Sequence, residues 1–178
     1  QIYTYLANYF KNKDLVKKKN FKALVTAGPT REYIDPVRYL TNESSGKQGY
    51  EIALALNKLG FKTKLITGPS NIIHQNDIKT IKVITAEEMF SEVKKSLPVD
   101  VAICAAAVSD FKPKKKNNKK LKKKDNSLLT IELEKNKDIL EYLGKNNRHR
   151  PKLVVGFAAE TENLNRNSIL KMKKKIVI

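Results

Sequence analysis

Residues that could bind a phosphorylated ligand follow the first apolar stretch of the chain, in the segment TAGPTREYIDPVRYLTNESSGKQGY at 26–50. Ser44, Ser45 and Gly46 come directly before an amphipathic helix that the pattern predicts at 47–59. The free backbone N–H groups and the dipole of a helix N-terminus attract anions. The spacing therefore predicts an anion site here, although Ser45 taken alone is more typical of a residue that caps a helix.

Four other side chains extend the chemistry of this segment. Arg31, Arg38 and Lys47 supply positive charge, and the amide of Asn42 can both donate and accept hydrogen bonds. The segment contains neither GxGxxG nor GxxxxGKS/T, which excludes the standard dinucleotide and P-loop fingerprints. About twenty residues without a predicted element are too many for a simple connection, so we interpret the segment as a ligand-binding loop.

A second candidate segment, AAAVSDF at 105–111, follows the most apolar predicted strand. Its small residues, among them Ala106 and Ala107, let a ligand approach the backbone closely. The carboxylate of Asp110 could bind a ribose hydroxyl or a metal ion, whereas an isolated aspartate is more often a turn residue. The residues alone leave both interpretations open.

Three later segments carry weaker signals. The lysines at 112–124 form, by pattern, a solvated charge run. In VVGFAAET, at 154–161, Phe157 could stack on a nucleobase, but its pattern favours the core. Lys171 and Lys175 lie one helical turn apart. The two histidines fall in polar stretches with no acid or nucleophile paired to them, so histidine chemistry is not predicted.

The elements that must position these residues alternate along the chain. We expect strands at 21–27, 61–67, 80–84, 99–107, 127–134 and 152–158, and helices at 47–59, 86–97, 138–147 and 162–175. This alternation indicates an α/β fold with a Rossmann-like, doubly wound and mostly parallel sheet. Each candidate loop follows a predicted strand, and ligands of such folds bind at the carboxyl ends of the strands.

One connection departs from the alternation. No helical pattern lies between Ala107 and Ser127, and a parallel crossover needs a dozen or more residues, usually with a helix. The strand at 127–134 is therefore predicted to pair antiparallel, and the lysine-rich segment before it becomes a long basic flap.

Composition limits the possible partners. A formal net charge of +18 invites nucleic-acid binding, but only 5 of the 36 basic residues are arginine, and Lys, Asn and Ile are abundant together. A solvated basic surface is the better interpretation, so no nucleic-acid partner is predicted.

No apolar run approaches the roughly 20 residues of a membrane helix, and the single cysteine, Cys104, excludes an internal disulfide framework. A cytoplasmic protein without a membrane partner is expected, with residues 1–20 a linker or the tail of an upstream domain.

Taken in order, TAGPTREYIDPVRYLTNESSGKQGY, AAAVSDFKP, the basic flap, NKDIL and VVGFAAET resemble the phosphopantothenate–cysteine ligase family, the C-terminal half of bacterial bifunctional coenzyme A proteins. The resemblance spans 21–178. It implies a homodimer that joins 4′-phosphopantothenate to L-cysteine through an acyl-cytidylate made from CTP, with Mg²⁺. It implies FMN only if a flavin-dependent decarboxylase, fused or associated, lies outside this chain. The chain stops before the family's following Ala-Asn-Asp segment, which predicts a truncated domain.

The resemblance also assigns roles by position. Asn42 matches the asparagine that holds the acyl-cytidylate, Arg38 a substrate-phosphate contact, and Lys120 the flap lysine needed for catalysis, although Lys119 or Lys122 could hold that role in so uniform a run. Asp110 matches a nucleotide-binding aspartate and is the expected metal contact. The full set predicted to contact the nucleotide is Gly28, Ser44, Ser45, Gly46, Ala106, Ala107, Asp110, Lys120, Lys137, Asp138, Ile139, Leu140, Phe157, Lys171 and Lys175.

The family usually has proline where Lys137 stands, so the turn there is less constrained by the backbone. The alternative function is a non-catalytic nucleotide or nucleic-acid binding domain, motivated by the charge. An NAD(P) oxidoreductase is disfavoured, because GxGxxG with a downstream ribose-binding acid is absent.

Overall fold

The computed structural model describes residues 21–72, 78–122, 130–145, 148–157, 162–163, 169–170 and 172–173. The predicted linker at 1–20 lies outside these residues. So do Lys171, Lys175 and most of the helix predicted at 162–175. In the described part of the chain, no helix combines the length and the apolar character needed to cross a membrane.

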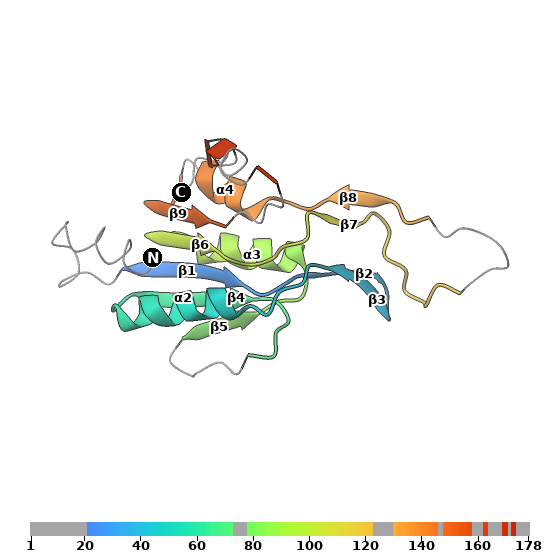
Figure 1. The fold of residues 1–178 in the computed structure, drawn as a ribbon, viewed down its shortest axis with the longest axis horizontal. Helices are drawn as coiled ribbons and strands as arrows, with labels where there is room; N and C mark the ends of the chain where they lie inside the picture. The colour runs from blue at the N-terminus through green and yellow to red at the C-terminus, as the bar shows by residue number, and fades with distance from the viewer. Residues whose placement is uncertain are drawn as a thin grey trace.

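Five parallel strands form the central sheet, in the order β5-β4-β1-β6-β9 (Figure 1). Their bounds are β1 Lys22–Ala27, β4 Lys62–Thr67, β5 Lys79–Lys82, β6 Val101–Cys104 and β9 Leu153–Gly156. The chain runs outward from β1 through β4 to β5, then returns to place β6 and β9 on the other side of β1. The strand order therefore reverses between β1 and β6, where sheets of this kind bind ligands. The predicted doubly wound fold is confirmed.

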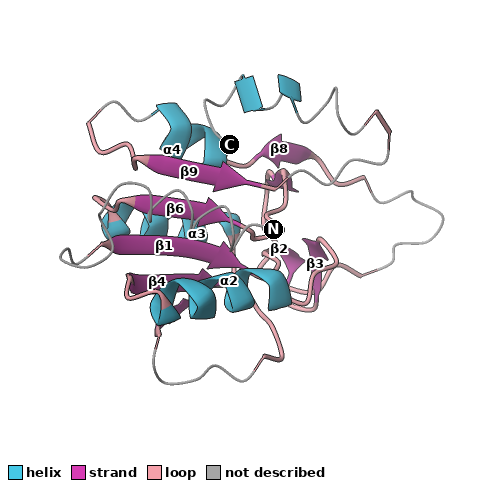
Figure 2. Ribbon diagram, turned by 60° about the vertical axis from the view of Figure 1, so that its left-hand side comes forward, coloured by secondary structure: helices cyan, strands magenta, loops and turns pink. Residues whose placement is uncertain are grey.

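Helices cover both faces of this sheet (Figure 2). Ala23 and Val25 of β1 pack in the cluster that includes α2, whereas Leu24 packs in the cluster that includes α3 and α4. A strand covered on both faces requires a continuous apolar run, which is what the sequence of β1 shows. The helix bounds are α2 Lys47–Lys58, α3 Ala86–Ser96 and α4 Ile139–Lys145.

The start of α2 lies unusually close to β1 because of Gly49. A Cβ at this position would stand 2.6 Å from the Cβ of Ala27 and 2.9 Å from the carbonyl oxygen of Thr26. We expect Gly49→Ala to lower the free energy of unfolding by about 2 kcal/mol, because neither neighbour can move without shifting the strand. Urea denaturation measures the effect. Gly60→Ala is the control: Gly60 has φ +88° but nothing within 4 Å of an added Cβ, so only backbone strain of about 1 kcal/mol is expected.

The segment at 26–50 is not the structureless loop that we predicted. It contains an antiparallel hairpin of β2 Arg31–Asp35 and β3 Arg38–Thr41. The side chains of Glu32 and Ile34 are buried while that of Tyr33 is half-buried, the period-2 pattern of a strand. The prediction missed it because the charged residues Glu32 and Asp35 occupy two of the buried positions.

The antiparallel pair predicted beside the basic flap is confirmed. Strands β7 Phe111–Pro113 and β8 Leu133–Lys135 pair antiparallel, and the N–H of Lys114 continues the ladder to the carbonyl of Glu132. The strand is shorter than predicted in its described part, which begins at Thr130. Both small hairpins extend beyond the carboxyl edge of the central sheet (Figure 1).

Candidate functional site

The candidate site lies where β1 and β6 end side by side. Beyond the strands, the N–H of Ala107 donates to the carbonyl of Gly28 at 2.9 Å, and Pro29 forms a parallel bridge with Ala107. The two chains stay paired to this point and then diverge, one into the β2–β3 hairpin and the other toward β7. The loops that follow β1 and β6 therefore face each other across the switch in strand order, as predicted.

Thr30 joins these loops and was not among the predicted site residues. Its side chain is fully buried, its hydroxyl oxygen accepts from the N–H of Ser109 at 3.0 Å, and its carbonyl accepts from the Thr41 hydroxyl at 2.7 Å. It thus fixes the residue before Asn42 against the loop after β6. Nothing in the sequence pattern distinguishes such a threonine from a solvent-exposed one.

Asn42 spans the crevice between the two loops. Its Nδ2 donates to the carbonyl of Val108 at 3.0 Å and lies 3.5 Å from that of Ala107. The residue is exposed, and no described residue donates to its Oδ1. The amide is therefore oriented by the backbone after β6 and presents its oxygen and remaining edge to a ligand.

The N-terminus of α2 opens toward the same place. Its N-cap is Gly46, in the left-handed region with φ +77°, and no side chain accepts a hydrogen bond at that cap. The prediction of Ser45 as the cap is therefore wrong, although its Oγ accepts from the N–H of Lys47 at 3.3 Å. A Cβ on Gly46 would meet Gly28 Cα at 3.1 Å, so glycine lets the helix start against the end of β1. The hydroxyl of Ser44 likewise accepts from the N–H of Gly46 at 3.3 Å, so an anion bound at this helix start would share these N–H groups with the serines or use the next ones along the first turn.

The N-terminus of α3 is different, because side chains already occupy it. Thr85 and Glu88 form a capping box, and the buried carboxylate of Glu32 accepts from the N–H of Ala86 at 2.8 Å. These acceptors satisfy the first-turn N–H groups that an anion would need. Glu32 thus anchors the β2–β3 hairpin to the helix.

A second group of predicted residues gathers between the ends of β6 and β9. The backbone N–H of Asn136 donates to the carbonyl of Asp110 at 2.8 Å. The side-chain Nδ2 of Asn136 donates to the carbonyl of Ser109 at 2.9 Å. Asp138 Oδ1 accepts from the N–H of Glu141 at the start of α4. The turn that contains Lys137 and Asp138 is therefore held beside the exposed Asp110.

The other members of this group differ in what they can offer a nucleotide. The Ile139 side chain is buried in the core, so only its backbone could reach a ligand. Leu140 packs against Gly156, where an added Cβ would stand 2.4 Å from its Cδ2. Phe157 is 37% exposed, which overturns the core position favoured by its pattern and leaves its ring accessible.

Lys137 is held by an ion pair with Glu87 on α3, at 2.9 Å, and its Nζ lies 5.2 Å from the centroid of the Phe90 ring. This pair restrains the turn at a position without the rigidity of proline. The hydrogen bond and charge of Lys137 lower the pKa of Glu87 below its ordinary value.

We expect Glu87→Gln to cost less than about 1 kcal/mol, because both side chains are more than half exposed. A lowered carboxyl pKa means that the contribution is complete above the ordinary pKa of about 4.3 and disappears as the pH falls below it. Denaturation of both proteins at pH 7 and pH 3 measures the difference. A larger difference at pH 3 than at pH 7 would contradict this assignment.

Arg38 is the exposed first residue of β3, and Lys120 lies on the flap. The Arg38 guanidinium binds Asp35 through Nε, at 3.0 Å, and through Nη2, which also donates to the carbonyl of Leu121 at 3.0 Å. The described part of the flap, 114–122, is therefore docked on the hairpin at Leu121. Lys120 is exposed and directly precedes the bound Leu121.

A cleft of about 680 Å³ opens beside the first group of residues. Its walls come from the β3 end, the start of α2 and the loop after β4, and include Arg31, Tyr39, Asn42, Ser44 and Asn71. The Arg31 guanidinium lies 4.7 Å from the Tyr39 ring centroid. The volume is in the range of small-molecule sites.

Metal ligands are sparse in the described part of the chain, where no three His, Cys, Asp or Glu side chains converge. Mg²⁺ commonly binds through one or two carboxylates together with substrate phosphates. Asp110, exposed at the edge of the site, fits the role of a single protein ligand to a nucleotide-bound Mg²⁺.

Comparison with known proteins places this geometry in a family. The model of the DNA/pantothenate metabolism flavoprotein C-terminal domain matches residues 18–177. The chain is 42% identical over 172 residues to the coenzyme A biosynthesis bifunctional protein CoaBC of Borreliella burgdorferi, covering 96% of this chain and 43% of that protein. It is 39% identical over 176 residues to CoaBC of Haemophilus influenzae, covering 98% and 43%.

Solved structures agree with this assignment. The crystal structure of a CoaBC C-terminal domain superposes with a TM-score of 0.77 at 39% identity, covering 89% of this chain and 74% of that one. A Cab2 variant in complex with phosphopantothenate-cysteine has the same fold, with a TM-score of 0.73 at 16% identity, covering 96% and 75%. The chain spans less than half the length of the bifunctional relatives it matches. It belongs to the family of DNA/pantothenate metabolism flavoprotein C-terminal domains.

Proposed function

We propose that the chain is a ligase domain of coenzyme A biosynthesis, which joins 4′-phosphopantothenate to L-cysteine at the expense of CTP. The observation that carries the proposal is that Asn42, oriented by the loop after β6, lines one cleft with Ser44 and Ser45 at the start of α2. An amide donor and an uncapped helix start are suited to an acyl group and a phosphate held side by side. Membership in the family supports the same reaction.

The reaction has two steps. A carboxylate oxygen of 4′-phosphopantothenate attacks the α-phosphorus of CTP, and the bond to the departing pyrophosphate breaks. The amine of cysteine then attacks the acyl carbon, the bond to CMP breaks, and the amine proton passes to solvent. Bound Mg²⁺ would neutralise charge on the triphosphate.

The chain's own residues would divide this work between the two groups described above. The helix start at Ser44–Gly46 would bind phosphate oxygens, and Asn42 would orient the acyl-cytidylate for the second step. Asp110, the Lys137–Leu140 turn and Phe157 would hold the ribose and base of the nucleotide. Lys120, on the docked flap, would bring positive charge to the transferred phosphoryl group.

A homodimer is part of the proposal. Both projecting hairpins carry exposed apolar side chains: Val37 is 58% exposed, Leu133 47% and Phe111 45%. Apolar residues gathered at one end of a molecule are suited to a partner surface. Sedimentation equilibrium tests this idea, since a monomer at tens of micromolar would contradict it.

The larger assembly is also a proposal. Relatives at about 40% identity are bifunctional proteins of which this chain matches 43%. A fused or associated flavin-dependent decarboxylase that binds FMN is therefore expected beside this domain. A cytoplasmic location and the absence of a nucleic-acid partner remain predictions from the sequence.

The decisive experiment measures pyrophosphate. The protein is mixed with 4′-phosphopantothenate, Mg²⁺ and either CTP or ATP, without cysteine, and pyrophosphate is followed over time. We expect release that requires 4′-phosphopantothenate and is faster with CTP, and coupled product only after cysteine is added. Thermal shift with each nucleotide separates failure to bind from failure to react. If neither nucleotide bound to the protein and neither gave pyrophosphate, the proposal would be ruled out.

A further inference from the structure

Asp35 occupies an unusual position for a residue outside the predicted site. Its side chain is fully buried at the turn of the β2–β3 hairpin, and its two oxygens have separate partners. Oδ1 accepts from the N–H groups of Val37 and Arg38, at 3.0 and 2.9 Å. Oδ2 accepts from the Arg38 guanidinium and from the N–H of Leu121, the latter at 3.1 Å. One oxygen forms the turn, and the other reaches the flap.

Leu121 is consequently held at both of its backbone polar groups. Its N–H donates to Asp35 and its carbonyl accepts from Arg38, 86 and 83 residues away in the sequence. The lysines on either side, Lys120 and Lys122, are exposed, whereas Leu121 is half-buried. The ion pair between Asp35 and Arg38, together with the backbone N–H and carbonyl of Leu121, forms a unit that we call the latch.

A second contact docks the same flap without using Asp35. The N–H of Asn117 donates to the carbonyl of Ile34 at 3.0 Å. The Nζ of Lys116 lies 5.4 Å from the centroid of the Tyr33 ring. The flap therefore has two attachments to the hairpin, and only the one at Leu121 uses the Asp35–Arg38 ion pair.

We propose that Asp35 is a positioning residue, which through the latch holds the flap on the hairpin and so fixes where Lys120 stands. The turn uses only Oδ1 of Asp35. Its Oδ2 is therefore left to bind the Arg38 guanidinium and the N–H of Leu121. Because Leu121 is bound at both its N–H and its carbonyl, the backbone of the residue before it has little freedom. The part that concerns Lys120 rests on the proposed function, whereas the latch itself does not.

Asp35→Asn tests the latch with an almost unchanged shape. With its oxygen at the turn, the asparagine amide would face Arg38 Nε, Arg38 Nη2 and the Leu121 N–H, and these three donors would lose the oxygen that they share in Asp35. Amide hydrogen exchange at neutral pH should then be at least about tenfold faster at Leu121, with a smaller change at Asn117 and none in β1. Equal acceleration at Leu121 and in β1 would mean general destabilisation, and an unchanged Leu121 would mean that no latch exists; either result overturns the proposal.

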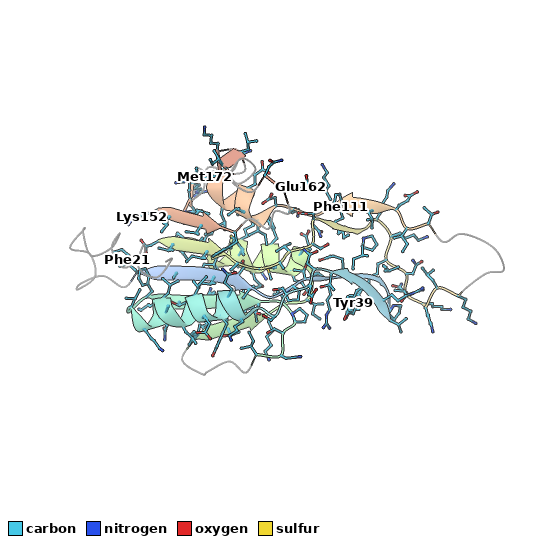
Figure 3. All side chains as sticks on the ribbon, viewed as in Figure 1. Phe21, Tyr39, Phe111, Lys152, Glu162 and Met172 are labelled. Carbon is cyan, nitrogen blue, oxygen red and sulfur yellow. The ribbon has the colours of Figure 1, made fainter. Side chains whose placement is uncertain are left out.

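Asp100→Asn is the matched control. The Asp100 carboxylate also joins a backbone N–H to a cation, accepting from Lys22 N at 3.0 Å and Lys152 Nζ at 3.2 Å. It lies at the amino end of the sheet, where Figure 3 shows Lys152, far from Tyr39 on the β2–β3 hairpin. Exchange at Leu121 should not change in this variant.

If Asp35→Asn does not fold, Arg38→Lys takes its place, since lysine keeps the charge but lacks the several N–H donors of the guanidinium. Faster exchange at Leu121 in Arg38→Lys would support the latch, and unchanged exchange would contradict it.

The pH dependence has a definite sign. The Arg38 guanidinium beside Asp35, followed by the N–H donors, holds the pKa of this carboxyl well below its usual range. A lowered pKa keeps the latch charged above the ordinary value of about 3.9, with a loss only as the pH falls below it. Protection at Leu121, corrected for intrinsic exchange, should therefore be constant from pH 8 to pH 5. Weakening within that interval would contradict an ionised Asp35.

The effect on Lys120 is tested by a double-mutant cycle in the ligase assay. Asp35→Asn is expected to lower kcat about tenfold in the parent protein and to have no further effect when Lys120 is alanine, since the two changes act on one step. Equal losses in both backgrounds would show that Asp35 does not act through Lys120. Should the parent show no activity, the proposed function fails, and the exchange data still decide whether the latch exists.

Discussion

Replacing Asn42 with aspartate is expected to leave pyrophosphate release largely intact and to slow cysteine-dependent product formation by roughly 10²–10³-fold, the usual cost of losing one preorganised donor. In the structure, Nδ2 donates to the carbonyl of Val108 at 3.0 Å. A carboxylate would place an oxygen against that carbonyl and a negative charge beside the acyl group, so the side chain would turn away from both. Accumulated acyl-cytidylate, trapped by acid quench and detected by mass spectrometry, is the measurement.

Asn136→Asp provides a matched control for this experiment. Its Nδ2 also donates to a carbonyl of the loop after β6, that of Ser109, at 2.9 Å, but on the side of the proposed nucleotide turn. This variant should weaken CTP use without changing the ratio of pyrophosphate to coupled product. Full coupling activity in Asn42→Asp, or the same altered ratio in both variants, would remove the special role assigned to Asn42.

Replacing Lys120 with alanine is expected to slow pyrophosphate release by roughly 10²–10³-fold, because a positioned cation at the transferred phosphoryl group is lost. The flap contains several lysines with the same exposure, so charge alone cannot single one out. Position narrows the choice to Lys120 and Lys122, which flank the Leu121 residue bound at both backbone groups. The family resemblance assigns the role to Lys120. Initial rates of pyrophosphate release at saturating CTP measure the loss.

Lys119→Ala and Lys122→Ala are the controls, since each removes the same charge from the same flap. We expect each to change the rate by less than about threefold, in line with the small effect of exposed charges. A loss at Lys119 or Lys122 that equals the loss at Lys120 would show that the flap acts only through its total charge. A large loss at one of them alone would move the role to that residue.

Much of the fold could be predicted from the order of apolar runs and turn residues. The central strands and the helices α2 and α3 lie within one to three residues of their predicted bounds, because a strand covered on both faces must be continuously apolar and Gly60 and Pro98 end helices. The antiparallel β7–β8 pair followed from the missing crossover helix. The β2–β3 hairpin did not, because its inward positions include the charged residues Glu32 and Asp35.

The candidate site shows the same division. Asn42, Gly46 and Asp110 could be selected because each follows a strand or precedes a helix, and the carboxyl ends of parallel strands meet at one edge. Thr30 and Asp35 could not be selected by periodicity, since the contacts that join them to the site loop and the flap, with Ser109 and Leu121, span 79 and 86 residues. One signal for Asp35 was present: Asp followed by Pro is typical of the first two positions of a turn.

By itself, the sequence determined the α/β architecture, the edge of the sheet where ligands are expected, and the residue types available there. These follow from local rules of hydrophobic periodicity, helix termination and turn chemistry, which act over a few residues. Tertiary structure alone decided that Asn42 is oriented by the Val108 carbonyl, that the N-terminus of α2 is open while that of α3 is filled, and that Leu121 is clamped by the Asp35–Arg38 pair. Each of these depends on hydrogen bonds between segments distant in the chain, and their partners are set by the packing of the sheet and not by neighbouring residues.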